Sequence, residues 1–255
     1  MDLVLDIADA HLFDTLYKPF NIDSSNIWRQ FISLYIITLF GILLFYLVFS
    51  TLSYFLIFDK EQEKHPKFLK NQIKREISVA LNSFPWMALM TVPWFLAEVR
   101  GYSRLYSEVG DWKYLLASAI AFLAFTDMMI YWIHRWLHHP ILYGRIHKPH
   151  HYWIIPTPFA SHAFHPLDGY SQSLPYHIFV FIIPMNSMLY LGLYMFVNMW
   201  TISIHDGFHS IESDIINSAA HHAVHHEQFS YNYGQYFTIW DRIGKTYKKP
   251  IKKSD

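Results

Sequence analysis

The stretch QFISLYIITLFGILLFYLVFSTLSYFLIF, residues 30–58, decides the fold, because its 29 residues include no Asp, Glu, Lys or Arg. A helix needs only about 20 apolar residues to cross a bilayer. The sequence therefore predicts a transmembrane helix here. A helix in a soluble all-helical core is the alternative, but further long uncharged runs in the same chain argue against it.

Three more apolar runs follow. Residues 77–97 are uncharged, and residues 114–133 carry only Asp127. The last run, 169–205, is 37 residues long, which is too long for a single crossing. It breaks naturally near Pro184, so we expect two short crossings or a re-entrant hairpin.

Composition supports a membrane protein and excludes other classes. Hydrophobic residues make up 53% of the chain and charged residues only 16%, against about 25% in soluble proteins. Lys+Arg and Asp+Glu balance at 20 each, so nothing indicates nucleic-acid binding. The acidic start, MDLVLDIAD, is not the basic segment of a cleavable signal peptide.

Basic residues predict which side of the membrane each loop faces. Residues 59–76 carry six Lys and Arg, so this segment is expected in the cytosol. Two crossings then bring the segment from His134 to His165 back to the cytosolic side. Lys252 and Lys253 resemble the dilysine signal that returns membrane proteins to the endoplasmic reticulum; a short basic tail near anionic lipid is the alternative.

Histidine is the unusual residue, with 17 copies against no cysteine. Without Cys, any metal must be bound by imidazole or carboxylate. Residues three or four apart share one face of a helix, so each histidine box can aim two or three imidazoles at one point. The boxes are His134 with His138 and His139, His147 with His150 and His151, His205 with His209, and His222 with His225 and His226.

These boxes predict a metal centre. One H-x3-H pair is weak evidence, but four sets of imidazoles in a membrane bundle would be costly without a partner for their lone pairs. The number exceeds the three or four ligands of a mononuclear zinc site, which favours two metal ions. Imidazole suits Zn, Cu, Fe and Ni alike.

Several residues near the boxes are candidates for a supporting or substrate-facing role. Asp127 lies on the same helical face as His134 and either orients an imidazole or reaches headgroups or a water-filled cavity. Asp168 is a further carboxylate candidate. His162 and His165, three residues apart, either join the metal site or face the substrate.

The chain resembles the fatty acid hydroxylase superfamily of membrane di-iron oxidases, and within it most closely the sterol C5-desaturase branch. The box spacings are shared across the superfamily, whereas PTPFASHAFHPLDG and NYGQYFTIWDRIG are more specific to the branch. The likeness covers essentially the whole chain. The stretches that carry it are HPKFLKNQIKREI (65–77), FTDMMIYWIHRWLHH (125–139), HKPHHYWIIPTPFASHAFHPLDG (147–169), WTISIHDG (200–207) and YNYGQYFTIWDRIG (231–244).

The resemblance implies a multi-pass enzyme of the endoplasmic reticulum that introduces the C5–C6 double bond into a Δ7-sterol. Such enzymes use two iron ions and O2, and they take electrons from cytochrome b5 and its NADH-dependent reductase. A flat apolar sterol predicts a slot lined by aromatic residues, for which Trp132, Trp136, Trp153 and Phe164 are candidates; ordinary packing is the alternative for each. The ligand positions that the resemblance implies are His134, His138 or His139, His147, His150, His151, His205, His222, His225 and His226, with His209 added in members that have an H-x3-H pair before the last box.

We therefore expect an all-α integral membrane protein, a transmembrane helical bundle with a cytosolic, histidine-rich di-metal catalytic cap. Residues 1–113 would form a membrane region with two transmembrane helices. Residues 114–255 would form the catalytic region with the boxes and the hairpin. A sterol 4-methyl oxidase, a fatty acid hydroxylase and a membrane metal transporter remain alternatives.

Overall fold

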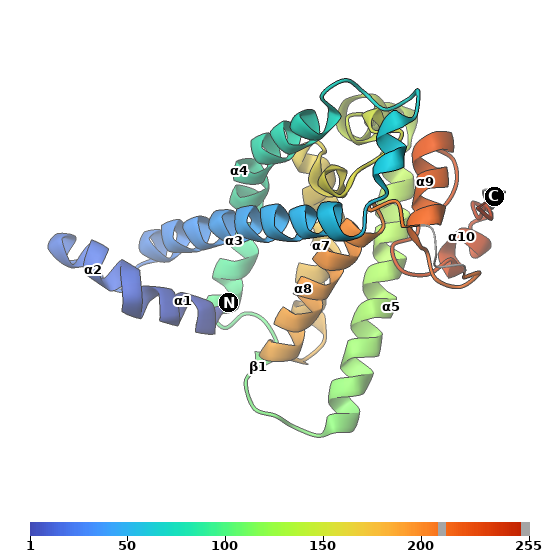
Figure 1. Ribbon diagram of the computed structural model, residues 1–255. Coiled ribbons are helices and arrows are strands. Elements are labelled where there is room, and N and C mark those ends of the chain that lie inside the picture. The colour runs from blue at the N-terminus through green and yellow to red at the C-terminus, as the bar shows by residue number, and fades with distance from the viewer. Residues whose placement is uncertain (209–212, 251–255) are drawn as a thin grey trace.

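A computed structural model describes residues 1–208 and 213–250 of the chain. In these residues the fold is helical apart from one pair of two-residue strands (Figure 1). The expectation of an all-α fold is therefore confirmed. His209, Lys252 and Lys253 lie outside the described residues, so the predictions made for them stay predictions.

Within the described residues, three helices are long and apolar enough to cross a membrane: α3 (Ile27–Leu56), α4 (Gln72–Val99) and α5 (Trp112–Leu137). The side chain of Asn26 caps α3 by accepting from two backbone N–H groups, and the side chain of Asp111 caps α5 by accepting from the Lys113 N–H. The apolar side chains on the outside of the bundle fit a lipid environment, as for Phe40, whose side chain is 65% exposed.

The long last run forms two helices of equal length, α7 (Pro166–Ile182) and α8 (Ser187–Ser203). They are joined at the predicted break, where β2 (Met185–Asn186) pairs in parallel with β1 (Leu105–Tyr106). Each helix has 17 residues and so extends about 26 Å, slightly less than the roughly 30 Å hydrocarbon core.

Shorter helical segments complete the chain. Several are single turns that carry the histidine boxes. Their bounds are α1 (Asp2–Ala8), η1 (Asp9–Phe13), α2 (Asp14–Tyr17), η2 (Lys18–Phe20), η3 (Lys60–Lys64), α6 (Pro140–Leu142), η4 (Tyr143–His147), η5 (His150–Tyr152), η6 (Pro158–His162), α9 (Ala219–Gln228) and α10 (Ile239–Ile243).

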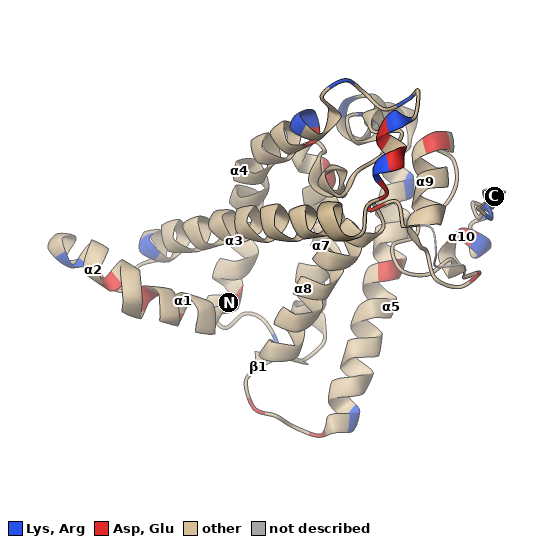
Figure 2. Cartoon of the chain, in the orientation of Figure 1, with Lys and Arg blue, Asp and Glu red and all other residues tan. Residues whose placement is uncertain are grey.

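Charged residues are sparse along the long helices and gather near their ends. Figure 2 shows α7 and α8 almost free of charged residues, while charges collect in the α3–α4 loop and around α9 and α10. Figure 1 shows that α5 ends beside α9 and α10, far from β1. The apolar part of the bundle and the charged, histidine-rich part are thus separate.

Aromatic packing fixes the segment between the second box and α7. Tyr46 of α3 and Phe84 of α4 pack with Phe159 of η6 in one buried cluster. The Tyr46 hydroxyl donates to the Phe159 carbonyl at 2.9 Å, and Ser83 donates to the Phe164 carbonyl. Helices α3 and α4 therefore hold η6 against the histidine-rich end.

Candidate metal centre

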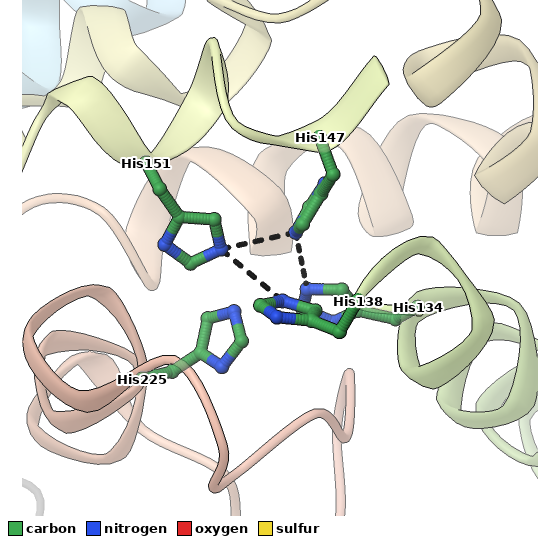
Figure 3. A group of neighbouring side chains, drawn as sticks. All are labelled: His134, His138, His147, His151 and His225. Carbon is green, nitrogen blue, oxygen red and sulfur yellow. Dashed lines mark hydrogen bonds between the residues drawn. The ribbon is translucent and has the colours of Figure 1, made fainter. Parts of the chain in front are cut away.

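Five histidines from four separate segments converge at the end of α5 (Figure 3). His134 and His138 come from the end of α5, His147 from η4, His151 from η5 and His225 from α9. One ring nitrogen of each lies within 4.8 Å of those of the other four. The Nε2 atoms of His147 and His134 are 3.1 Å apart, those of His147 and His151 3.0 Å, and those of His151 and His138 3.2 Å. We call these five residues the first histidine group.

Four further histidines form the second histidine group: His150, His205, His222 and His226. All four are buried. The Nε2 atoms of His222 and His205 are 2.9 Å apart, those of His226 and His222 3.1 Å, and those of His205 and His150 3.4 Å. The structure therefore brings nine of the eleven predicted ligand residues into two clusters.

The two groups are neighbours, and the segments η5 and α9 contribute histidines to both. The ring centroids of His151 and His226, one from each group, are 5.0 Å apart. In α9, His222 and His226 are four residues apart and face the second group, whereas His225 faces the first. Each H-x2-HH box therefore aims two imidazoles at one point, as expected, and sends its middle histidine, His150 or His225, to the other group.

The spacing of the nitrogens fits metal coordination. Two nitrogens that each lie about 2.1 Å from one ion are roughly 3.0 to 3.4 Å apart, depending on the angle between the bonds. The closest Nε2 pairs in both groups have separations of 2.9 to 3.4 Å. His225 Nε2 is buried without a hydrogen-bond partner among the described residues. The donor sets are therefore compatible with one cation in each group.

The protonation states of the grouped histidines also fit metal binding. Burial, and after it the charge of neighbouring histidines, holds the pKa of His150, His222 and His225 well below the usual 6.5. Burial lowers the pKa of His205 to about 4. These four imidazoles are thus neutral at physiological pH, the form that binds metal.

One carboxylate orients a histidine of the first group. His147 Nδ1–H donates to Asp168 Oδ2 at 2.7 Å, and both side chains are fully buried. The other oxygen, Asp168 Oδ1, accepts from Gln172 Nε2 at 2.7 Å. The carboxylate therefore fixes the tautomer of His147 and leaves its Nε2 lone pair facing the group.

Backbone carbonyls fix the tautomers of three other histidines in the same way. Each donates its Nδ1–H to a carbonyl, which leaves Nε2 free to bind a cation. The pairs are His134 with Tyr233 O at 3.0 Å, His205 with Thr201 O at 2.7 Å and His225 with Tyr231 O at 2.7 Å.

Two buried carboxylates hold the loop that supplies the Tyr231 and Tyr233 carbonyls. Asp241 accepts from the backbone N–H groups of Tyr233 and Gly234, each at 2.8 Å. Asp127 accepts from the Tyr236 N–H at 2.7 Å and is only 1% exposed. Both predicted roles of Asp127, orienting an imidazole and reaching headgroups or water, are therefore wrong; it acts on the loop. Sequence reasoning missed Asp241, although this residue lies in the branch-specific segment NYGQYFTIWDRIG.

Other predicted site residues lie apart from both groups. His139 is exposed, and its Nδ1 accepts from the Ile141 N–H that begins α6. The prediction of His139 as a ligand is wrong because α5 ends at Leu137, so the chain turns away before residue 139. His165 is half-buried and caps α7 through the Leu167 N–H. His162 is buried and belongs to neither group.

A cavity of about 550 Å³ extends from the histidines into the bundle. This volume is within the range of roughly 300 to 1,000 Å³ for small-molecule sites. His134 of the first group is in its wall, and so are His150, His205 and His222 of the second. Among the described residues that line it, none has an Asp, Glu, Lys or Arg side chain. Apolar walls come from several helices, for example Ile37, Phe45, Met87, Phe95, Tyr176 and Leu191.

Of the four aromatic residues predicted to line a substrate slot, only Phe164 does so. Trp132 and Trp136 point outward and are 37% and 62% exposed. Trp153 is buried elsewhere and donates to the Ala163 carbonyl at 3.1 Å. The slot-lining alternative is therefore wrong for these three tryptophans. The helical phase of α5 turns residues 132 and 136 away from the cavity, and Trp153 is part of the ordinary packing.

Comparisons with known proteins agree with this site. Residues 119–246 match the sequence model of the family described as fatty acid hydroxylase. The chain is 54% identical to the lathosterol oxidases of Mus musculus and Homo sapiens, over 98% of this chain and 86% of each relative. It is 51% identical to a Delta(7)-sterol 5(6)-desaturase of Schizosaccharomyces pombe, over 98% of this chain and 84% of that protein. No solved structure matches it significantly.

The helical membrane fold and the two histidine groups define a membrane-bound histidine-box oxidase, and the chain belongs to the fatty acid hydroxylase family. Within that family it is a member of the sterol C5-desaturases, the group of the lathosterol oxidases.

Proposed function

We propose that the protein removes one hydrogen from C5 and one from C6 of a Δ7-sterol, with two iron ions in the histidine groups and O2 as the oxidant. The sterol loses two hydrogen atoms, that is two protons and two electrons, and gains the C5–C6 double bond. These two protons and two electrons, together with two further electrons and two further protons, reduce O2 to two molecules of water. The further electrons would come from cytochrome b5, which its NADH-dependent reductase reduces.

The cavity is the observation that carries this proposal. It is apolar over most of its wall and reaches histidines of both groups. Its lack of an Asp, Glu, Lys or Arg side chain matters, because a carboxylate or phosphate buried there would need a cationic partner. A neutral lipid alcohol such as a sterol has no such requirement.

The roles of the protein side chains follow from the contacts. The nine grouped histidines would hold the ions, and bound iron would supply the reaction with O2. Asp168 and the backbone carbonyls keep the ligand tautomers that bind metal. The apolar wall excludes water from the reacting carbons and holds the sterol against the histidines.

A second opening gives the first group a separate access route. A cleft of about 180 Å³ is lined by His138, Tyr143 and Tyr233. His138 does not line the larger cavity. We assign the larger cavity to sterol binding. We assign this cleft to the delivery of protons and electrons to the first histidine group.

Membrane placement is also part of the proposal. The basic α3–α4 loop supports a cytosolic position for the histidine-rich end, where cytochrome b5 could reach it. We place the protein in the endoplasmic reticulum membrane, with residues 1–113 as the membrane region and 114–255 as the catalytic region. The family match over residues 119–246 supports this division.

Membranes that contain the protein test the reaction when they are supplied with a Δ7-sterol, NADH and O2. We expect a new 5,7-diene, detected by its ultraviolet absorbance and by mass spectrometry, and none without O2. A 4-methyl oxidation product or a hydroxylated fatty acid in its place would overturn the proposal. Metal analysis of the purified protein tests the iron assignment, for which we expect two ions per chain.

A further inference from the structure

The apolar cavity is closed at its histidine end. His150, His205 and His222 in its wall are only 2% to 5% exposed. Phe164, whose ring centroid lies 5.9 Å from that of His150, is 8% exposed. A substrate therefore has to reach these histidines along the cavity, from an opening elsewhere in its wall.

The wall is open farther from the histidines. Among the described residues that line the cavity, the exposed ones are Leu3, Gly41, Ser107, Met188 and Met195. Gly41 is at the midpoint of α3, and Met195, which is 43% exposed, is at the midpoint of α8. Helices α3 and α8 contact each other and meet at a steep angle (Figure 1). Gly41 and Met195 therefore mark an opening between these two helices.

This opening lies at the depth of the lipid tails. Helix α3 is long and apolar enough to cross the bilayer, and its midpoint lies within the uncharged run 30–58. The exposed side chains around the opening are apolar, with Phe40 65%, Leu44 53% and Phe196 42% exposed. Because the middle of a bilayer is hydrocarbon, the opening faces lipid tails and admits molecules dissolved in them.

The absence of a side chain at Gly41 keeps the opening clear. A Cβ atom built there would meet no packed neighbour within 4 Å. Ile37 and Phe45, one turn away on either side, place their side chains in the cavity wall. Gly41 is thus the point of α3 at which an apolar molecule meets the least obstruction.

Helix α8 lines the cavity along nearly its whole length. Met188, Met195, Asn198 and Thr201 are spaced by seven, three and three residues, so they share one face. From Met188 to Thr201 this face extends about 20 Å, room for the fused rings and the side chain of a sterol. At its end, the Thr201 carbonyl accepts from His205 Nδ1–H at 2.7 Å. The face therefore connects the opening with the second histidine group.

We propose that the sterol enters the cavity sideways from the bilayer, between α3 and α8, where Gly41 and Met195 border the opening. It then lies along α8, with the rings that carry C5 and C6 at the histidine end and its side chain toward Met188. This inference rests on the proposed function, because the substrate must be dissolved in the membrane and C5 must reach the histidine groups.

Gly41→Trp tests the passage, because it places a large ring in the opening and changes no residue of either histidine group. The metal-loaded protein is reconstituted in bilayers, and the rates at which a radiolabelled Δ7-sterol binds and is released are measured without O2. We expect both rates to fall by about 10-fold to 100-fold, the effect of forcing a molecule past an added side chain. The dissociation constant should stay unchanged, because an obstructed passage slows binding and release alike. With NADH and O2, kcat/KM for diene formation should fall as well.

Gly192→Trp is the matched control. Gly192 is an exposed glycine of α8 with equally open space around it, but it does not line the cavity. Both rates should stay within about twofold of wild type. Metal content reports folding, and if Gly41→Trp loses metal, Met195→Trp takes its place. Its control is Met199→Trp, because Met199 is 45% exposed and lies outside the cavity wall.

Three results would decide against these assignments. Wild-type rates in metal-loaded Gly41→Trp, or equal losses in Gly192→Trp, would overturn the route. Slow binding in Met188→Trp alone would also overturn it, because entry would then lie at the end of the cavity beside β2. Absence of diene from the wild type would instead overturn the reaction, while the binding and release rates would still decide the route.

Discussion

Replacing Asp168 by Asn should selectively weaken metal binding by the first histidine group. The carboxylate accepts two hydrogen bonds, from His147 Nδ1 and from Gln172 Nε2, both at 2.7 Å. An amide has one oxygen, so it must turn an N–H toward one of these two donors. Because Asp168 and His147 are fully buried, water cannot compensate.

The size of the effect follows from that conflict. A buried donor without an acceptor costs about 1 to 3 kcal/mol. If His147 takes the other tautomer to avoid the clash, its Nε2 carries the proton and cannot bind metal. Loss of a carboxylate behind a ligand histidine lowers metal affinity by about 10-fold to 100-fold.

Metal bound per chain, measured against increasing chelator, is the assay. We expect Asp168→Asn to release one ion at about 10-fold to 100-fold lower chelator and to retain the second like wild type. Asp206→Asn is the control, since Asp206 is a buried neighbour of His205 but accepts from the Phe208 N–H at 2.8 Å. Wild-type retention of both ions in Asp168→Asn, or equal losses in both variants, would refute the reasoning.

Three further results are expected. His225→Ala should lose metal and reduce diene formation to background, whereas His139→Ala, on the surface, should stay within about twofold of wild type. Asp241→Asn should lower the free energy of unfolding by about 1 to 3 kcal/mol, because one amide oxygen cannot replace the two carboxylate oxygens that accept from the Tyr233 and Gly234 N–H groups. Thermal or denaturant unfolding measures this change, and an unchanged midpoint would contradict it. Because burial and then neighbouring imidazoles keep the pKa of His151 and His222 well below 6.5, protons compete with metal only in stronger acid. Dialysis at stepped pH should therefore release metal well below pH 6.5, and release centred at 6.5 would be contrary to expectation.

Local patterns were sufficient for the membrane fold and for most of the candidate ligands. The uncharged run at 30–58 predicts α3 because the bilayer sets the minimum length of an apolar helix. The break near Pro184 is equally local, because proline and the following Asn186 cap end one helix and begin the next. The box spacings predict neighbouring imidazoles because helical periodicity relates residues three and four apart.

The sequence alone thus determined which helices form and that their histidine side chains can bind metal. Only the tertiary structure decided how the histidines divide between two groups, since His225 and His222 of one short helix face different neighbours. It also decided the support of the ligands, because the carbonyls of Tyr231, Tyr233 and Thr201 act through backbone that no residue type marks. The apolar cavity arises where helices distant in sequence pack together. Periodicity describes one segment at a time, whereas coordination and cavities depend on how separate segments meet.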